Sequence, residues 1–520
     1  MPPMRRTAIV SLFVLAGGAT AAGADPLTLA VRLVRQAAPA GGATAVPSLF
    51  GDVTGPAEPV ALGDLLERAV RSAPALAQAR VDQAVADAQL EQAQAWREWQ
   101  LQGTAAGSIR HNLGSDDRGV SLSGSLGRKI FTGGVVGVQV GSDWGRTVRT
   151  VNVAGMTLEQ SQAGYTESIT ATFSQPLLRG RGEAQVLAGV RAADLQRDAT
   201  ALVEDAQVIA IVRDLVLAYL DLAQTERELA IVRGSLDLTR ERLRVTQAGI
   251  SAGGTARAES IAVEQAIATR EEEILADELA VVERSLTVRR LAGMVIAPGQ
   301  LVLATSIELA IPPRTWDARG LLDAAIAHSP ELARLRALEA GATIEVEVSE
   351  NGILPSLDLA LSFGPSGTDD DPARATVNMA TFDDFTAAVA LTYRSSLGEH
   401  VAKGTARAAR ARRESVRVSA DDLRAQLSLA ITQATLQVLA AERRFTISTR
   451  AIGLAEQNLA VEQARMSSGK SRNVDVLQRQ DELRAAQLRA ARAVLDWHRA
   501  ATVIAALTGE ILPKYGVSAR

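Results

Sequence analysis

Residues able to perform catalysis or hold a metal are present in this chain but scattered along it. The 520 residues include no cysteine, and the four histidines, His111, His328, His400 and His498, lie far apart. Metal and nucleophile sites need such groups at short spacing, as in H-E-x-x-H or G-x-S-x-G, and neither motif occurs. The absence of cysteine excludes disulfides, iron–sulfur clusters and thiolate zinc sites. We therefore predict no catalytic residue, no cofactor and no metal, and a protein that is not an enzyme.

Two glycine-containing segments could suggest phosphate binding. Gly469-Lys470-Ser471 is similar to the end of a phosphate loop, but Ala464 stands where an earlier glycine is required and a helical pattern precedes it. The glycines between positions 133 and 145 do not open a helix, so a dinucleotide site is not indicated. The net charge of -4 gives no reason to expect a nucleic-acid partner.

The N-terminus has the pattern of a secretory signal peptide. Arg5 and Arg6 precede a short apolar run from Thr7 to Ala16, and Ala22-Gly23-Ala24 forms a small-residue cleavage site. We expect residues 1–24 to be removed and the protein to be exported.

No later segment predicts a transmembrane helix. The best apolar stretch, from Val208 to Leu220, is interrupted by Arg213 and Asp214. Because unpaired backbone groups are costly in lipid, we expect any membrane-spanning part to be a closed β-barrel.

Two long stretches without proline predict long helices. No proline occurs between Pro176 and Pro298, or between Pro372 and Pro513. In the first stretch, Leu222, Thr225, Leu229, Val232, Leu236, Thr239 and Leu243 alternate spacings of three and four, which is a coiled-coil seam. We expect helices over about 185–247, 256–291, 403–466 and 474–507, with tips at about 248–255 and 467–473.

Three segments alternate apolar with small polar residues and predict half-buried strands. They are Ser168–Ser174, Ser356–Phe363 and Phe385–Tyr393. Their polar face is mostly Ser, Thr and Ala, which suits a barrel with lipid outside and water inside. Most of the aromatic residues lie near these segments, as expected for the girdles of a membrane barrel, although aromatics also simply favour strands.

The two halves of the sequence are alike. Leu65–Ala77 parallels Leu321–Ala333, and the helix break Gln247–Ser251, which includes Gly249 and Ile250, parallels Ser467–Ser471. Pro330 follows Pro74 by 256 positions, but Gly469 follows Gly249 by 220, so the first half holds about 36 extra residues. Two further alternating runs within 120–144, with a turn at 131–134, account for this excess. They form a longer barrel hairpin, an extracellular excursion or a periplasmic flap.

This order of elements resembles TolC-like outer-membrane efflux proteins over about 59–512. The resemblance rests on A-x-x-x-x-P-x-L at Ala69–Leu76 and Ala325–Leu332, and on Ile353–Leu359, Ser174–Gly180 and Gly469 followed by Val474–Leu477. It implies a homotrimer in the outer membrane. Each protomer would give four strands to a twelve-stranded barrel and helices to a periplasmic tunnel.

The same resemblance implies a passive conduit with protein partners. A periplasmic adaptor would bind the helical tips, and an inner-membrane transporter would supply the substrate. A periplasmic adaptor or a structural coiled-coil protein of the envelope is the alternative. The duplication argues against the adaptor, and the Ser/Thr-faced strands argue against the fibrous protein.

The resemblance also places a pore constriction at the second tip. Asp475 matches the first of two pore aspartates of the family, and Gln478 stands at the second. The locking tyrosine and arginine of the family fall at Met466 and Ser471, and Lys470 and Arg472 flank them as substitutes. In the first tip, Thr255 matches Asp475. A first-turn carboxylate that stabilises the helix is the competing interpretation of Asp475.

The adaptor-contact candidates are at the two tips. They are Gly249, Ile250, Ser251, Gly469 and Ser471. For Gly249 and Gly469 the competing interpretation is positive φ at a helix end.

We therefore predict a mainly α-helical, duplicated protein with a coiled-coil body and transmembrane strands. Its expected segments are a signal peptide (1–24), an Ala/Gly/Pro-rich lead (25–59), a first repeat (60–294, strands about 103–176), an equatorial connection (295–318), a second repeat (319–512, strands about 355–394) and a tail (513–520).

Overall fold

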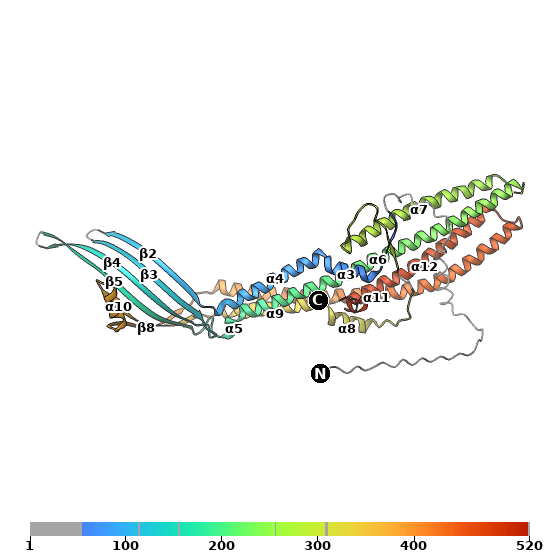
Figure 1. Cartoon of the computed structure of the whole chain (residues 1–520). Helices are drawn as coiled ribbons and strands as arrows, with labels where there is room; N and C mark the ends of the chain where they lie inside the picture. The colour runs from blue at the N-terminus through green and yellow to red at the C-terminus, as the bar shows by residue number, and fades with distance from the viewer. Residues whose placement is uncertain (1–54, 113–114, 154–155, 255, 307–309, 518–520) are drawn as a thin grey trace, which may run out of the picture.

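A computed structural model of the chain places a bundle of long helices at one end and a β-sheet at the other (Figure 1). The structure describes residues 55–112, 115–153, 156–254, 256–306 and 310–517. The expected signal peptide, most of the 25–59 lead and Thr255 lie outside these residues.

The four predicted long helices are confirmed within a few residues. They are α6 (Ala188–Ser251), α7 (Ala258–Leu291), α11 (His400–Ser467) and α12 (Asn473–Leu507). The shorter helices are α3 (Leu62–Ser72), α4 (Pro74–Gln94), η1 (Ala95–Arg97), α5 (Glu183–Val186), α8 (Ala318–His328), α9 (Pro330–Asn351), α10 (Pro372–Ala380) and α13 (Ile511–Tyr515). None of the described helices carries an apolar stretch long enough to cross a membrane.

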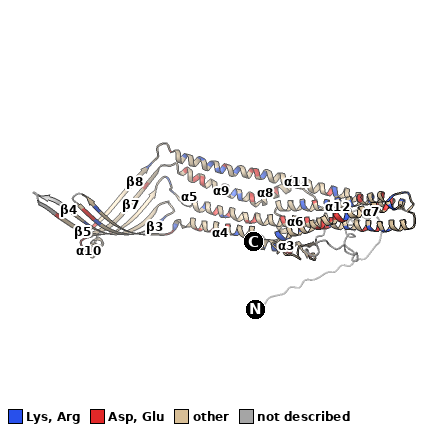
Figure 2. Cartoon of the chain, turned by 90° about the horizontal axis from the view of Figure 1, so that it is seen from above, with Lys and Arg blue, Asp and Glu red and all other residues tan. Residues whose placement is uncertain are grey.

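The helices stand side by side and form a wall. Next to the sheet the neighbours run in the order α4, α6, α9, α11, and toward the tips in the order α7, α6, α12, α11 (Figure 1). Charged side chains are spread along these helices and are sparser on the strands (Figure 2). The wall is therefore one helix thick and ends at α4 and α7 on one side and at α11 on the other.

A small belt fixes the middle of the wall. Strand β1 (Glu58–Val60) pairs in parallel with β6 (Leu303–Thr305). The buried hydroxyl of Tyr219 in α6 donates to the carbonyl oxygen of Val60 at 3.0 Å and accepts from the amide of Ser306 at 2.9 Å. A buried hydroxyl with both roles satisfied holds the two connecting segments against α6.

The sheet has six strands, not the four that the family resemblance implied. They are β2 (Gln100–Asn112), β3 (Ser115–Lys129), β4 (Val135–Val153), β5 (Met156–Pro176), β7 (Ser356–Asp369) and β8 (Asp384–Arg394). Their spatial order is β2-β3-β4-β5-β7-β8, antiparallel throughout. The sequence left three placements open for residues 120–144. The structure shows the first of them, a hairpin that lies within the sheet.

The turn between β3 and β4 is anchored at the junction with the helices. As predicted, it lies at 131–134, where Gly133 has φ of +93°. The carbonyl oxygen of Thr132 accepts from the amide of Gly182 at 3.0 Å, and Phe131 meets Trp96 edge to face at 5.0 Å. These contacts tie the β3–β4 hairpin to the rest of the chain.

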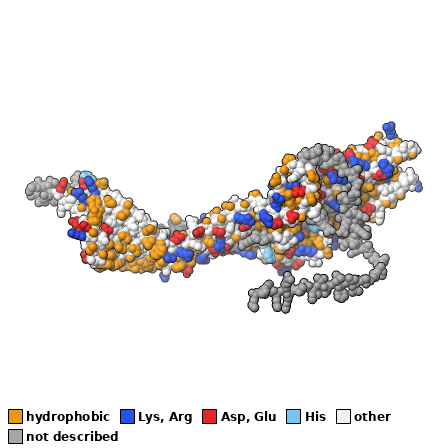
Figure 3. All heavy atoms as spheres, in the orientation of Figure 1, with side chains coloured by type: hydrophobic (Ala, Val, Ile, Leu, Met, Phe, Trp, Pro, Cys, Tyr) orange, Lys and Arg blue, Asp and Glu red, His pale blue; other side chains and the backbone are white. Residues whose placement is uncertain are grey.

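The strand register separates an apolar face from a polar one, as the alternation predicted. Leu126, Val138, Ala171, Phe363 and Ala387 form one continuous row across five strands. The adjacent row, on the opposite face, consists of Ser125, Gln139, Thr170 and their polar or small neighbours. Hydrophobic side chains gather over the sheet in the space-filling view (Figure 3).

Candidate functional site: the helical tips and the wall

The second helical tip closes through a glycine with positive φ, as predicted. Gly469 has φ of +73°. The amide of Lys470 donates to the carbonyl oxygen of Arg465 at 2.9 Å, and the amide of Gly469 donates to that of Met466 at 2.9 Å. This is a Schellman turn, in which a glycine lets the chain leave α11 without steric cost.

The first tip has the same turn, but Gly249 does not form it. Gly249 and Ile250 lie inside the last turn of α6, so the prediction of positive φ at Gly249 is wrong. Gly253 takes that role, with φ of +75°, while the amide of Gly254 donates to the carbonyl oxygen of Gly249 at 3.0 Å. Several glycines stand near this turn, and only the hydrogen-bond geometry selects one of them.

This correction shifts the comparison of the tips by four residues. Gly469 follows Gly253 by 216 positions, so the excess of the first half is 256 - 216 = 40 residues. The residue of the first tip that stands where Asp475 stands in the second is then Glu259, in the first turn of α7, and not Thr255. Both tips therefore begin their second helix with a carboxylate.

Asp475 is exposed and also caps its own helix. Its Oδ2 accepts from the amide of Arg472 at 3.1 Å and lies 3.4 Å from the hydroxyl oxygen of Ser471. Gln478, one turn further along α12, is exposed too, and its amide nitrogen lies 3.4 Å from Glu482. The carboxylate stabilises the start of α12 and remains open to solvent, so capping and a pore role are compatible.

The basic candidates lie at the turn itself. Lys470 and Arg472 are exposed, whereas the hydroxyl of Ser471 donates to Glu462 at 2.5 Å. Ser251, at the first tip, is exposed and donates to the carbonyl oxygen of Ala248 at 2.8 Å. The structure thus brings the second-tip candidates together around the start of α12, with those of the first tip at the end of α6.

A buried clasp joining the two tips was missed by sequence reasoning. Asn473, the first residue of α12, is fully buried, and its Nδ2 donates to Oγ1 of Thr246 in α6 at 3.1 Å. That hydroxyl is 2.9 Å from the carbonyl oxygen of Arg242, and the amide of Asn473 donates to Oε2 of Glu259 in α7 at 3.0 Å. One asparagine therefore links three helices, and no local pattern marks it because its partner is 227 positions away.

An arginine ladder continues this link along the hairpins. Arg499 of α12 donates to Asp221 of α6 at 2.5 Å and to Gln224 at 2.6 Å, and Arg492 donates to Glu228 at 2.7 Å. Nearer the tip, Arg484 pairs with Glu273, and Arg270 pairs with Asp481. The buried guanidinium of Arg270 also donates from Nε to the hydroxyl of Ser235 at 3.0 Å, so these pairs lock α12 onto the first hairpin.

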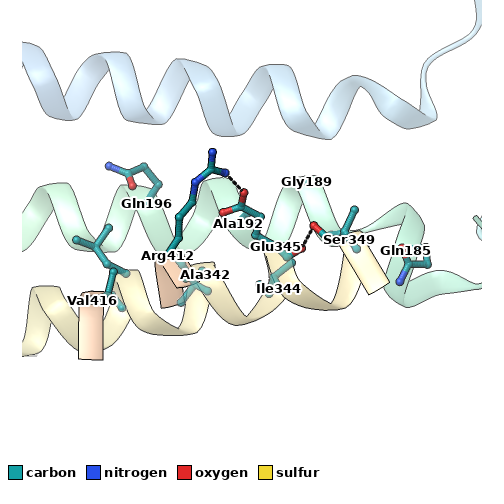
Figure 4. Close-up of a pocket in the computed structure, with 16 residues that line it drawn as sticks. Gln185, Gly189, Ala192, Gln196, Ala342, Ile344, Glu345, Ser349, Arg412 and Val416 are labelled. Atoms are coloured by element: carbon teal, nitrogen blue, oxygen red, sulfur yellow. Dashed lines mark hydrogen bonds and ion pairs between the residues drawn. The ribbon is translucent and has the colours of Figure 1, made fainter. Parts of the chain in front are cut away.

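A shallow groove of about 660 Å³ lies between α6, α9 and α11, near the sheet (Figure 4). Its floor is made of small residues such as Ala188, Gly189, Ala192, Gly341 and Ala342. Arg412 pairs with Glu345 at its rim, and the neighbouring Arg410 donates to Glu350 at 2.7 Å. The polar side chains of its lining also bond within the chain, since the hydroxyl of Ser349 donates to the carbonyl oxygen of Glu345 at 2.7 Å.

The described residues contain no group of three or more His, Cys, Asp or Glu side chains placed to hold a metal ion. Burial lowers the pKa of His498 to about 4, with the positive charge of Lys514 as a further cause. Its Nε2 is buried without a hydrogen-bond partner, and Trp497 lies edge to face against it at 4.9 Å. The imidazole is therefore neutral at pH 7 and packs against the Trp497 ring.

Part of the chain is similar in sequence to a known protein family. Residues 321–510, within the second half of the chain, match the family model of the outer membrane efflux protein. No curated protein matches the chain in a sequence search.

Solved structures share the fold over most of the chain. VceC of Vibrio cholerae, an outer membrane protein, is 16% identical, with a TM-score of 0.58 over 86% of this chain and 96% of its own. The CmeC outer membrane channel of Campylobacter jejuni is 11% identical, with a TM-score of 0.60 over 86% and 85%. The MtrE outer membrane channel of Neisseria gonorrhoeae, in its open state, is 15% identical, with a TM-score of 0.57 over 86% and 89%. The predicted resemblance to outer-membrane efflux proteins is thereby confirmed.

Proposed function

We propose that three copies of this chain form a channel through the outer membrane, with the sheets in the membrane and the helices in the periplasm. The channel is a passive conduit to the exterior. One observation carries this proposal: the chain forms a wall with two free edges. One end of the wall consists of helices, and the other end is a sheet with one apolar and one polar face. Such a wall cannot enclose a space alone, and rotational copies of it can.

Exposed apolar side chains follow the edges of the wall and support closure. On α11, exposed leucine, isoleucine and valine side chains recur at spacings of seven or eleven residues, which keeps them on one helix face. These residues are Leu429, Leu436, Ile447, Leu454 and Val461. The opposite edge exposes Val81 and Val85 on α4 and Ile261, Leu275 and Leu279 on α7. A protomer-to-protomer seam would bury both stripes.

The two faces of the sheet support membrane insertion. The apolar face would contact lipid and the Ser/Thr-rich face would line a wet lumen. Tyr393 ends β8 beside the helices, and Phe363, Phe382 and Phe385 cluster toward the other end, with Phe363 and Phe385 centroids 6.0 Å apart. Aromatics at both ends of an apolar band fit the interfaces of a membrane.

The two halves of the protomer share the order helix, helix, strands, long helix, tip and helix. We infer that they arose by duplication, with repeats at about 60–294 and 319–512. The hairpin β3–β4 is the addition in the first repeat. Equivalent tips would place Asp475 and Glu259 at the same level, where three copies of each could ring the pore.

Opening would require α12 to part from the first hairpin, across the clasp and the arginine ladder. A periplasmic adaptor contacting Gly249, Ile250, Ser251, Gly469 and Ser471 would supply the binding energy, and an inner-membrane transporter would supply the substrate. Lys470 and Arg472 would add positive charge beside the acidic ring.

Single-channel conductance of the detergent-purified protein in a planar bilayer tests the proposal, with Asp475→Asn beside it. We expect small cation-selective steps whose selectivity falls severalfold in the variant, because a neutral amide keeps the cap but removes charge from the ring. Unchanged selectivity would show that the constriction lies elsewhere than at Asp475. A protein that fractionates with soluble periplasmic proteins and yields no trimer would refute the channel.

A further inference from the structure

The edges of the six-stranded sheet carry an inference that deepens the proposed function and rests on it. Strands β2 and β8 are at the two ends of the sheet, and every described residue of both is exposed. Each edge presents unpaired backbone amides and carbonyls, which lipid cannot satisfy. The occupant of each edge must supply a strand of its own.

We propose that β8 of one protomer pairs with β2 of the next, so that three six-stranded sheets close a single barrel of eighteen strands. The direction of the strands fits. Strand β2 leaves the helices after η1, and β8 returns to them at α11, so the two are antiparallel across the seam. Three copies of six strands give an even number, and every neighbouring pair in the closed barrel is then antiparallel.

The face pattern fits the same seam. Near the helices, Leu101 on β2 lies in the apolar row of Leu126, and Val389 and Leu391 on β8 lie in apolar rows too. These three side chains are more than three-fifths exposed in the single chain. Ile109, further along β2, is on the same face but pairs in register with Arg118. Pairing β8 with β2 would continue the apolar face around the end of the barrel next to the helices.

The width of the helical wall agrees with six strands rather than four. Four helices about 10 Å apart span an arc of roughly 40 Å. Six strands about 4.8 Å apart and tilted by about 40° span roughly 38 Å, whereas four would span roughly 25 Å. The hairpin β3–β4 therefore brings the sheet to the same arc as the helices that continue from it.

Closure of eighteen strands widens the barrel. At the same tilt, its backbone diameter would be about 36 Å against about 24 Å for twelve strands, and its cross-section about 2.25 times larger. The lumen lining would be small and polar, since β3 and β4 add Ser121, Ser123, Ser125 and Gln139 to that face. The inserted hairpin would thus set the width of the exit.

Distances between nitroxide labels in the purified trimer test the inference. The chain has no cysteine, so Ala171→Cys on β5 gives one label per protomer. We expect labels on neighbouring protomers about 31 Å apart in the full chain and about 21 Å apart when residues 113–155 are deleted, a decrease by one third. The deletion joins β2 to β5, which are antiparallel, so the four remaining strands can still form a sheet.

A label at the tip is the matched control. Gln247→Cys lies at the exposed end of α6, where the barrel width has no effect, so its distance should not change with the deletion. A distance of about 21 Å at Ala171 in the full chain, with the trimer and its conductance intact, would overturn the eighteen-strand barrel and leave the channel standing. If neither site shows a distance between protomers, both the eighteen-strand barrel and the trimeric channel are overturned. If the deleted chain fails to fold, the strand count of the full chain by electron cryo-microscopy decides: eighteen supports the inference and twelve overturns it.

Discussion

The clasp at Asn473 gives the sharpest test of how the tips are held together. Replacing Asn473 by alanine removes the hydrogen bond from Nδ2 to Thr246 and leaves the backbone donation to Glu259 in place. The hydroxyl of Thr246 can still donate to the carbonyl oxygen of Arg242, so the substitution leaves this hydroxyl with a partner. We therefore expect a loss of about 0.5–1.5 kcal/mol per protomer, the usual net contribution of a hydrogen bond whose remaining partner is satisfied.

The effect on opening would be multiplied by the number of protomers. A loss of about 1.4 kcal/mol changes an equilibrium tenfold, so three tips that open together would shift it by roughly a thousandfold. Single-channel recording should show a large rise in open time for Asn473→Ala. The control is Arg489→Ala, which truncates an exposed side chain on the same helix, sixteen residues beyond Asn473.

A double-mutant cycle separates this contact from general loosening. Because both side chains belong to one hydrogen bond, Asn473→Ala with Thr246→Val should cost little more than Asn473→Ala alone. Additive effects, or an open time equal to that of the native protein, would refute the idea that this clasp keeps the tips closed.

Three further outcomes follow from the packing. Gly469→Ala should lower the free energy of unfolding by about 1 kcal/mol because Gly469 has a positive φ. Gly453→Ala, inside α11 with open space around it, should raise that free energy by up to about 1 kcal/mol. If chemical denaturation shows changes of the same sign for the two variants, this reasoning is wrong. The folded pKa of His498, about 4, lies below its unfolded value, so the stability that is present above pH 6.5 should fall as the pH drops toward 4. By pH 4.5 we expect thermal unfolding to show a loss of about 2–3 kcal/mol. His498→Gln should abolish this loss, and the exposed His328→Gln should not. Arg499→Lys should lose about 1 kcal/mol at low salt, because an ammonium cannot reach Asp221 and Gln224 as the guanidinium does; a variant as stable as the native chain would show that the ladder adds nothing there.

Patterns within one element were sufficient to predict that element. The absence of proline predicted α6 and α11, and alternation over Phe385–Tyr393 predicted β8, because a side chain's face depends only on its position in a regular backbone. The resemblance of the second half to efflux proteins was likewise readable from short motifs in order. Asp475 was named as a tip residue from the family resemblance, and its competing interpretation, a carboxylate in the first helical turn, is a local signal.

The tertiary structure decided what joins distant parts of the chain. It selected Gly253 over Gly249 as the turn glycine, because the turn depends on which amides reach which carbonyls. It brought Asn473 to Thr246, and it put β3 and β4 into the sheet, giving six strands where the family resemblance implied four. Alternation shows that a segment is a strand with two different faces, but the neighbours of that strand are set by hydrogen bonds between segments that no local period encodes.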